Sequence, residues 1–117
     1  MTLLDKALEL GKTISVSDEY NLVKQVEENL RNDEVARKLI VDFQDLQKYY
    51  DRMEMAGQRI TEENMKKLDE MEQKAMENVT VRSYYEANSR FHELVETVNA
   101  KIQEGISGRP AHSCGGG

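Results

Sequence analysis

The feature that most constrains the fold is a seam of apolar residues spaced three and four positions apart. It runs from Ala36 to Met53, and its successive spacings are 3, 4, 3, 4 and 3. This spacing keeps the side chains on one face of an α-helix and is typical of a helix that packs against another helix. A second seam of the same kind runs from Tyr84 to Ile102. Two long helices are therefore predicted.

Few residues that break helices interrupt these seams. Residues 1–104 contain no proline, and Gly11 and Gly57 are their only glycines. Asn32 or Asp33 can accept hydrogen bonds from the free N–H groups at the start of one helix, and Thr61 can do so at the start of the next. Val79 to Val81 is the one short β-branched run, which is too short for a sheet. We expect an all-α fold of about five helices, over residues 2–14, 17–31, 33–56, 61–77 and 80–104. The helices at 33–56 and 80–104 are expected to lie antiparallel, bridged by the shorter one at 61–77, in a helical bundle that forms a dimer.

The composition changes near Gly105. Residues 105–117 contain five of the seven glycines and the only proline. Such a segment buries too little apolar surface to offset the entropy lost on ordering. We therefore expect one helical domain at 1–104 and a flexible Gly-rich tail at 105–117.

Charge and cysteine content exclude several classes of protein. The formal net charge is −6, which disfavours general binding to nucleic acid, because phosphate contacts need Lys and Arg. A single cysteine cannot form an internal disulfide. No apolar run approaches the roughly 18 residues of a membrane span, and Asp5 and Glu9 interrupt the first apolar stretch, which disfavours a secretion signal. A cytoplasmic location without membrane contact is expected.

Tyrosine and methionine gather near the end of the helix expected at 33–56. Such a cluster can belong to the core, or it can be an interface, where aromatic residues and Met are enriched. Two more tyrosines lie early in the last helix. The candidates for contact with a partner protein are Tyr49, Tyr50, Met53, Met55, Tyr84 and Tyr85.

The tail holds the one residue pattern with plausible metal chemistry, His112 and Cys114. Imidazole and thiolate bind zinc or the iron of an iron–sulfur cluster, but a closed site needs about four ligands. A site here would have to be shared between chains, with Cys114 as cluster ligand and His112 as metal ligand. The alternatives are an exposed inert thiol and a redox-sensing thiol.

Signatures of catalysis are missing from the sequence. There is no Gly-rich loop for phosphate and no Gly-x-Ser-x-Gly motif. The chain's other histidine, His92, has no neighbouring partner for a catalytic pair. We expect a protein that is not an enzyme.

Three stretches of the chain resemble the YlbF/YmcA-like family of small bacterial helical regulators. Residues 32–43 (NDEVARKLIVDF) are similar to the family's entry into its long helix, and residues 55–61 (MAGQRIT) to the turn that follows. Tyr85-Glu86-Ala87, followed by Phe91 and Leu94, looks like the family's final helix. The resemblance covers about residues 2–104.

The resemblance implies an all-helical protein that forms a dimer or binds sibling proteins. Some members act in a three-protein complex that is associated with competence, sporulation and biofilm development and assists an endoribonuclease in processing messenger RNA. Some carry cysteines near the C-terminus that help to bind iron–sulfur clusters. The function expected here is that of a non-catalytic regulatory or adaptor subunit. A sensor that uses a cluster or metal at Cys114 is the alternative, and a helical chaperone is a further one.

Overall fold

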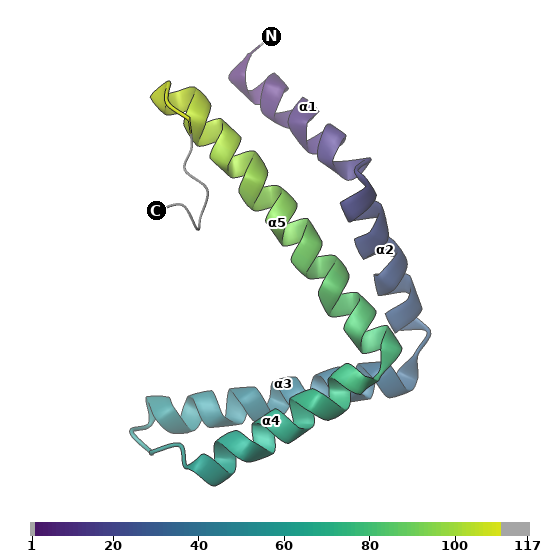
Figure 1. Cartoon of the computed structure of the whole chain (residues 1–117), viewed down its shortest axis with the longest axis vertical. Coiled ribbons are helices and arrows are strands. Elements are labelled where there is room, and N and C mark those ends of the chain that lie inside the picture. Colours follow the sequence, from purple (N-terminus) through teal and green to yellow (C-terminus); the bar gives the residue numbers. More distant parts are fainter. Residues whose placement is uncertain (1, 111–117) are drawn as a thin grey trace. The chain divides into compact units, whose positions relative to one another are not determined.

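The computed structural model describes residues 2–110 and contains five helices (Figure 1). The residues it describes form no β-strand, so the predicted all-α fold is confirmed. Each helix begins and ends within three residues of the predicted bounds. The helices are α1 (Leu3–Ser15), α2 (Asp18–Arg31), α3 (Glu34–Met55), α4 (Glu62–Glu77) and α5 (Val79–Ser107).

Side chains cap the starts of these helices as the sequence predicts. The Asp33 carboxylate accepts a hydrogen bond of 3.0 Å from the backbone N–H of Ala36. Thr61 and Asn64 exchange two hydrogen bonds of 3.1 Å at the start of α4, which is a capping box. Each satisfies N–H groups that have no partner within the helix. Two caps were not predicted. Thr2 accepts from the backbone N–H of Asp5 at 3.1 Å in α1, and Asn78 accepts from the backbone N–H of Val81 at 3.1 Å in α5.

The chain divides into two compact units. One comprises residues 24–85 and contains the end of α2, the α3–α4 hairpin and the start of α5. Its core is a cluster of Ala36, Ile40, Ala75 and Val81, in which Ala36 and Val81 are completely buried. Small and β-branched side chains let these helices approach closely.

The turn that closes the hairpin depends on a glycine. Gly57 has φ +82°, in the left-handed region that other residues rarely adopt. The chain leaves α3 there, and α4 then runs back antiparallel along α3 (Figure 1). Gly57 thus fixes the position of the hairpin's end.

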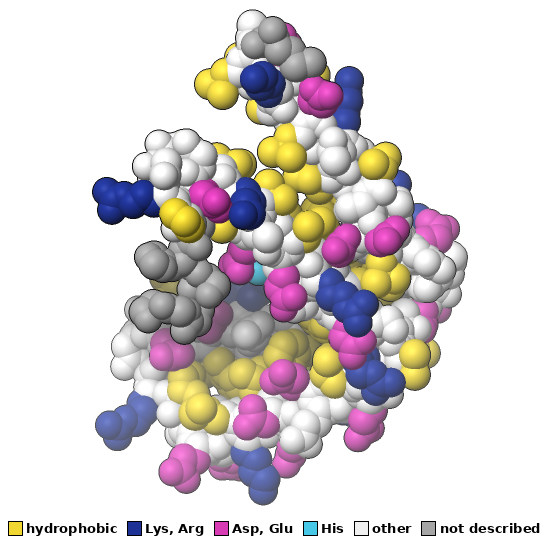
Figure 2. All heavy atoms as spheres, turned by 45° about the horizontal axis from the view of Figure 1, so that its top comes forward, with side chains coloured by type: hydrophobic (Ala, Val, Ile, Leu, Met, Phe, Trp, Pro, Cys, Tyr) yellow, Lys and Arg dark blue, Asp and Glu magenta, His cyan; other side chains and the backbone are white. Residues whose placement is uncertain are grey.

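The other unit contains α1, the start of α2 and α5 from Glu86 onward. Within it the rings of Tyr20 and Phe91 lie 5.3 Å apart, centroid to centroid. Helix α1 buries no residue, and its leucines are exposed. Hydrophobic side chains gather on the surface of α1, near the top of Figure 2.

The last helix is longer than the sequence predicts. Helix α5 continues through Ser107, so residues 105–107, which the composition assigned to the tail, are helical. The neighbour that packs along α3 is α4. That α3 lies antiparallel to α5 stays a prediction, because α3 and most of α5 belong to different units. The dimer is also still a prediction.

Candidate functional site

The tyrosines and methionines predicted to contact a partner fall into two groups. The first group lies at the end of α3. Tyr50 is buried at 6 % exposure, whereas Tyr49 beside it is 58 % exposed and Met55 is 88 % exposed. Met53 is half-buried. Tyr50 therefore belongs to the packing of the hairpin, and Tyr49 and Met55 stand at its surface.

A cavity of about 610 Å³ opens beside this group. Its apolar lining comes from Tyr50 of α3, Ile60 of the turn, and Met65 and Leu68 of α4. Met65 is 59 % exposed. The sequence analysis missed these α4 side chains, although their spacing within the helix at 61–77 was a usable signal. We call Tyr49, Met55, Ile60 and Met65 the hairpin-end surface.

Charged side chains border the same cavity. Asp51 and Glu54 of α3 and Arg59 of the turn line it, and all three are exposed. An apolar centre with a charged rim is the usual composition of a protein–protein interface.

The second group, Tyr84 and Tyr85, lies near the start of α5. Both half-buried rings pack against the core cluster, with their centroids 5.5 Å apart and their planes nearly perpendicular. Burial raises the pKa of the Tyr85 hydroxyl, and the negative charge on Glu72 adds to the effect. The core cluster includes Ala36 and Ile40 from the start of α3, whereas Tyr49 and Met55 lie at its end. The six predicted residues thus form two separate groups within one unit.

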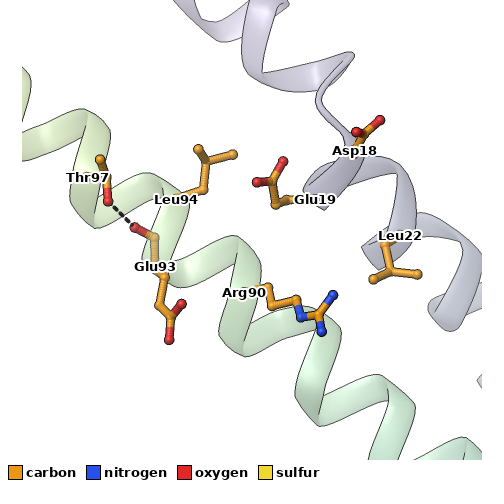
Figure 3. A pocket seen from close by; sticks show the side chains of 7 residues that line it. All are labelled: Asp18, Glu19, Leu22, Arg90, Glu93, Leu94 and Thr97. Atoms are coloured by element: carbon orange, nitrogen blue, oxygen red, sulfur yellow. Dashed lines mark hydrogen bonds between the residues drawn. The ribbon is translucent and has the colours of Figure 1, made fainter.

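A cleft in the other unit lies between α2 and α5 (Figure 3). Its volume is ≈ 420 Å³. Glu19 extends from α2 toward α5, and Arg90 extends from α5 toward α2. The side chain of Glu93 points away from α2, and its backbone carbonyl accepts a hydrogen bond of 2.9 Å from the Thr97 hydroxyl. The lining of this cleft carries both acidic and basic side chains, so the cleft favours no one class of ligand.

The residues predicted to bind a metal or cluster, His112 and Cys114, lie outside the described residues. Within residues 2–110, no group of three or more His, Cys, Asp or Glu side chains is placed to hold a metal ion. His92 is exposed, and its Nε2 lies 3.1 Å from a carboxylate oxygen of Glu96, one turn along α5. His92 is therefore a surface residue of the helix.

Comparison with known proteins decides the family. The model of the YlbF/YmcA family, described as control of competence regulator ComK, matches residues 3–107. The chain belongs to the YlbF/YmcA family. The predicted resemblance is therefore confirmed, and the family's description is that of a group that controls a regulator.

Relatives named as UPF0342 proteins match most of the chain. A UPF0342 protein of Alkalihalophilus pseudofirmus is 31 % identical over 100 residues, which cover 86 % of this chain and 85 % of that protein. A UPF0342 protein of Desulfitobacterium hafniense is 30 % identical, with 92 % and 82 % covered. One of Halothermothrix orenii is 26 % identical, with 91 % and 90 % covered. No solved structure matches the chain.

None of the helices within residues 2–110 has the length and the unbroken apolar stretch that a bilayer span requires. The long helices α3 and α5 carry charged side chains along their whole length.

Proposed function

We propose that this YlbF/YmcA-family protein is a non-catalytic regulatory or adaptor subunit that binds other helical proteins through its hairpin-end surface. The observation that carries the proposal is the exposure of Tyr49 and Met55 at the end of α3 and of Met65 in the lining of the neighbouring cavity. Large apolar side chains that stand together in water favour association, because their burial removes apolar surface from solvent. Met adapts its shape to different partners.

The partners that fit this proposal are a second copy of the chain or sibling proteins of the same family. The family's description as control of competence regulator ComK supports a regulatory role. A part in a complex that modulates RNA processing and developmental regulation follows from the family resemblance. A helix from a sibling would place apolar residues in the cavity and basic residues near Asp51 and Glu54.

The experiment is purification of the tagged full chain from its own cells under anaerobic conditions, with mass spectrometry of the proteins that follow it. Sibling family members are expected in the wild-type sample. Tyr49→Ser and Met55→Ser should each weaken recovery of the sibling about tenfold, as expected at the centre of an interface. Val41→Ser is the matched control, because Val41 is also exposed on α3, at 51 %, but lies about two turns before Tyr49 and away from the end of the helix.

Two results would contradict the proposal. One is a chain that stays monomeric at tens of micromolar and recovers no sibling. The other is equal recovery of the sibling with wild type and with both hairpin-end variants, which would place the contact elsewhere.

The second candidate function is a sensor whose cluster or metal is shared between chains through Cys114, with His112 as a further ligand. The residue types at this spacing favour it, since one chain supplies two of about four ligands and a complex could supply the rest. The same anaerobic sample tests it. A visible absorption band of an iron–sulfur cluster that disappears in Cys114→Ser would support a cluster, and zinc found by elemental analysis in wild type but not in Cys114→Ser would support a metal site. A sample with neither the band nor bound metal would rule the sensor out.

A further inference from the structure

A second cavity in the α3–α4 unit lies apart from the residues that make up the hairpin-end surface. Its volume is ≈ 420 Å³, within the range of sites for small ligands. Phe43, Gln44 and Gln47 line it from α3, Glu72 and Met76 from α4, and Tyr85 from α5. Gln47 is the one residue that also lines the cavity at the hairpin end.

The floor of this cavity is apolar and firmly held. Met76 and Tyr85 pack directly against the core cluster, and Phe43 is half-buried beside them on α3. Because Met76 and Tyr85 rest on the buried core cluster, this part of the floor is formed before any ligand binds. It suits a flat apolar body, which would stack on the rings of Phe43 and Tyr85.

The polar groups around the cavity favour a positive charge. Glu72 is the only charged side chain in its lining, and the others are the amides of Gln44 and Gln47 and the hydroxyl of Tyr85. Glu72 lies close enough to Tyr85 to act on its hydroxyl electrostatically, and Gln44 forms a hydrogen bond to that hydroxyl. A carboxylate and two aromatic rings attract a cation and repel an anion.

We propose that this cavity binds an amidinium or guanidinium group carried on an apolar body. Two sources have this chemistry, a free organic cation and an arginine side chain of a partner protein. The inference does not depend on the hairpin-end surface and would stand if that surface bound nothing.

The test is titration of the full-length ¹⁵N-labelled chain, followed by two-dimensional NMR, with benzamidine, its neutral analogue benzamide and its anionic analogue benzoate. Benzamidine should move the signals of Gln44, Gln47 and Tyr85, benzamide should bind more weakly, and benzoate should not bind. A fourth titration with N-acetyl-arginine methylamide separates the sources. Tighter binding of this compound than of benzamidine indicates a partner's arginine, and the reverse indicates a free aromatic cation.

Glu72→Gln removes the charge and keeps the shape of the side chain. It should weaken binding of benzamidine about fivefold, the size expected for a partly exposed ion pair. Glu70→Gln is the matched control, since Glu70 is also exposed on α4 but does not line the cavity. Equal binding of benzoate and benzamidine, shifts scattered over other helices, or equal loss in both variants would overturn the proposal.

Discussion

The ring of Tyr20 lies against the ring of Phe91, with centroids 5.3 Å apart and planes tilted by 46°. This contact joins the start of α2 to the middle of α5, two segments far apart in the sequence. Both rings are half-buried. In a unit whose first helix buries no residue, this contact is part of the packing of α2 against α5.

The first prediction concerns this aromatic pair. Tyr20→Ala and Phe91→Ala should each lower the free energy of unfolding by about 2–3 kcal/mol, because each removes a large, partly buried ring. The double variant should lose less than the sum, with a coupling of about 0.5–1.5 kcal/mol for the aromatic contact. Urea denaturation followed by circular dichroism measures all three. His92→Ala is the control, and additive losses would show that the two rings do not interact.

The second prediction compares the same substitution at two glycines. Gly57→Ala should destabilise the protein by about 1 kcal/mol, because its φ of +82° strains a residue with a Cβ. Gly11→Ala should stabilise it by about 0.5–1 kcal/mol, since Gly11 lies within α1 and alanine is the better helix former. A Cβ meets no atom within 4 Å at either position. Thermal unfolding compares the two variants, and a shift of the same sign in both would contradict the argument.

A third prediction concerns the buried core. Val81→Ala should cost about 2 kcal/mol, because Val81 is completely buried and two methyl groups are lost. Val79→Ala, two residues earlier in α5, should cost less than about 0.5 kcal/mol, since Val79 is 65 % exposed. Denaturation midpoints in urea measure the difference. Equal losses would mean that Val81 does not lie in the core.

The fourth prediction concerns pH. The pKa of Asp33 lies below its usual value of 3.8, first because its carboxylate accepts the hydrogen bond from the Ala36 backbone and next because of a hydrogen bond with Thr80. A carboxyl whose pKa is lowered by folding stabilises the folded state above pH 3.8, and this contribution is lost as the pH falls through the lowered pKa. The melting temperature of wild type should therefore fall more steeply than that of Asp33→Asn as the pH is lowered from 5 to below 3.

Asn at position 33 still caps α3 but does not titrate in this range. The gap in melting temperature between wild type and Asp33→Asn should be constant above pH 5 and should narrow below pH 3.8. Asp69→Asn is the control, because Asp69 is exposed within α4 and caps no helix. Parallel curves for wild type and Asp33→Asn would contradict the prediction.

The helices and their caps were predictable because their signals are local. Asp33, Thr61 and Gly57 act within four residues of their own positions, so the sequence alone indicates where α3 and α4 begin and where α3 ends. Asn78 was equally local and was overlooked.

Which apolar residues face outward was less predictable, because it depends on the neighbouring helix. Tyr49 and Tyr50 are adjacent in sequence and alike in chemistry, yet only Tyr50 turns toward α4. The contribution of Met65 and Leu68 to the same cavity depends on the pairing of α3 with α4, which the spacing of either helix alone does not specify.

Helix α1 has a consequence for how this sequence can change. Leu3, Leu4 and Leu8 are 82 %, 78 % and 62 % exposed, so polar replacements there cost the folded chain little. Folding therefore places little constraint on which residues occupy these three positions. Selection that keeps these positions apolar would have to act through contact with another molecule, because the core of this chain does not need them.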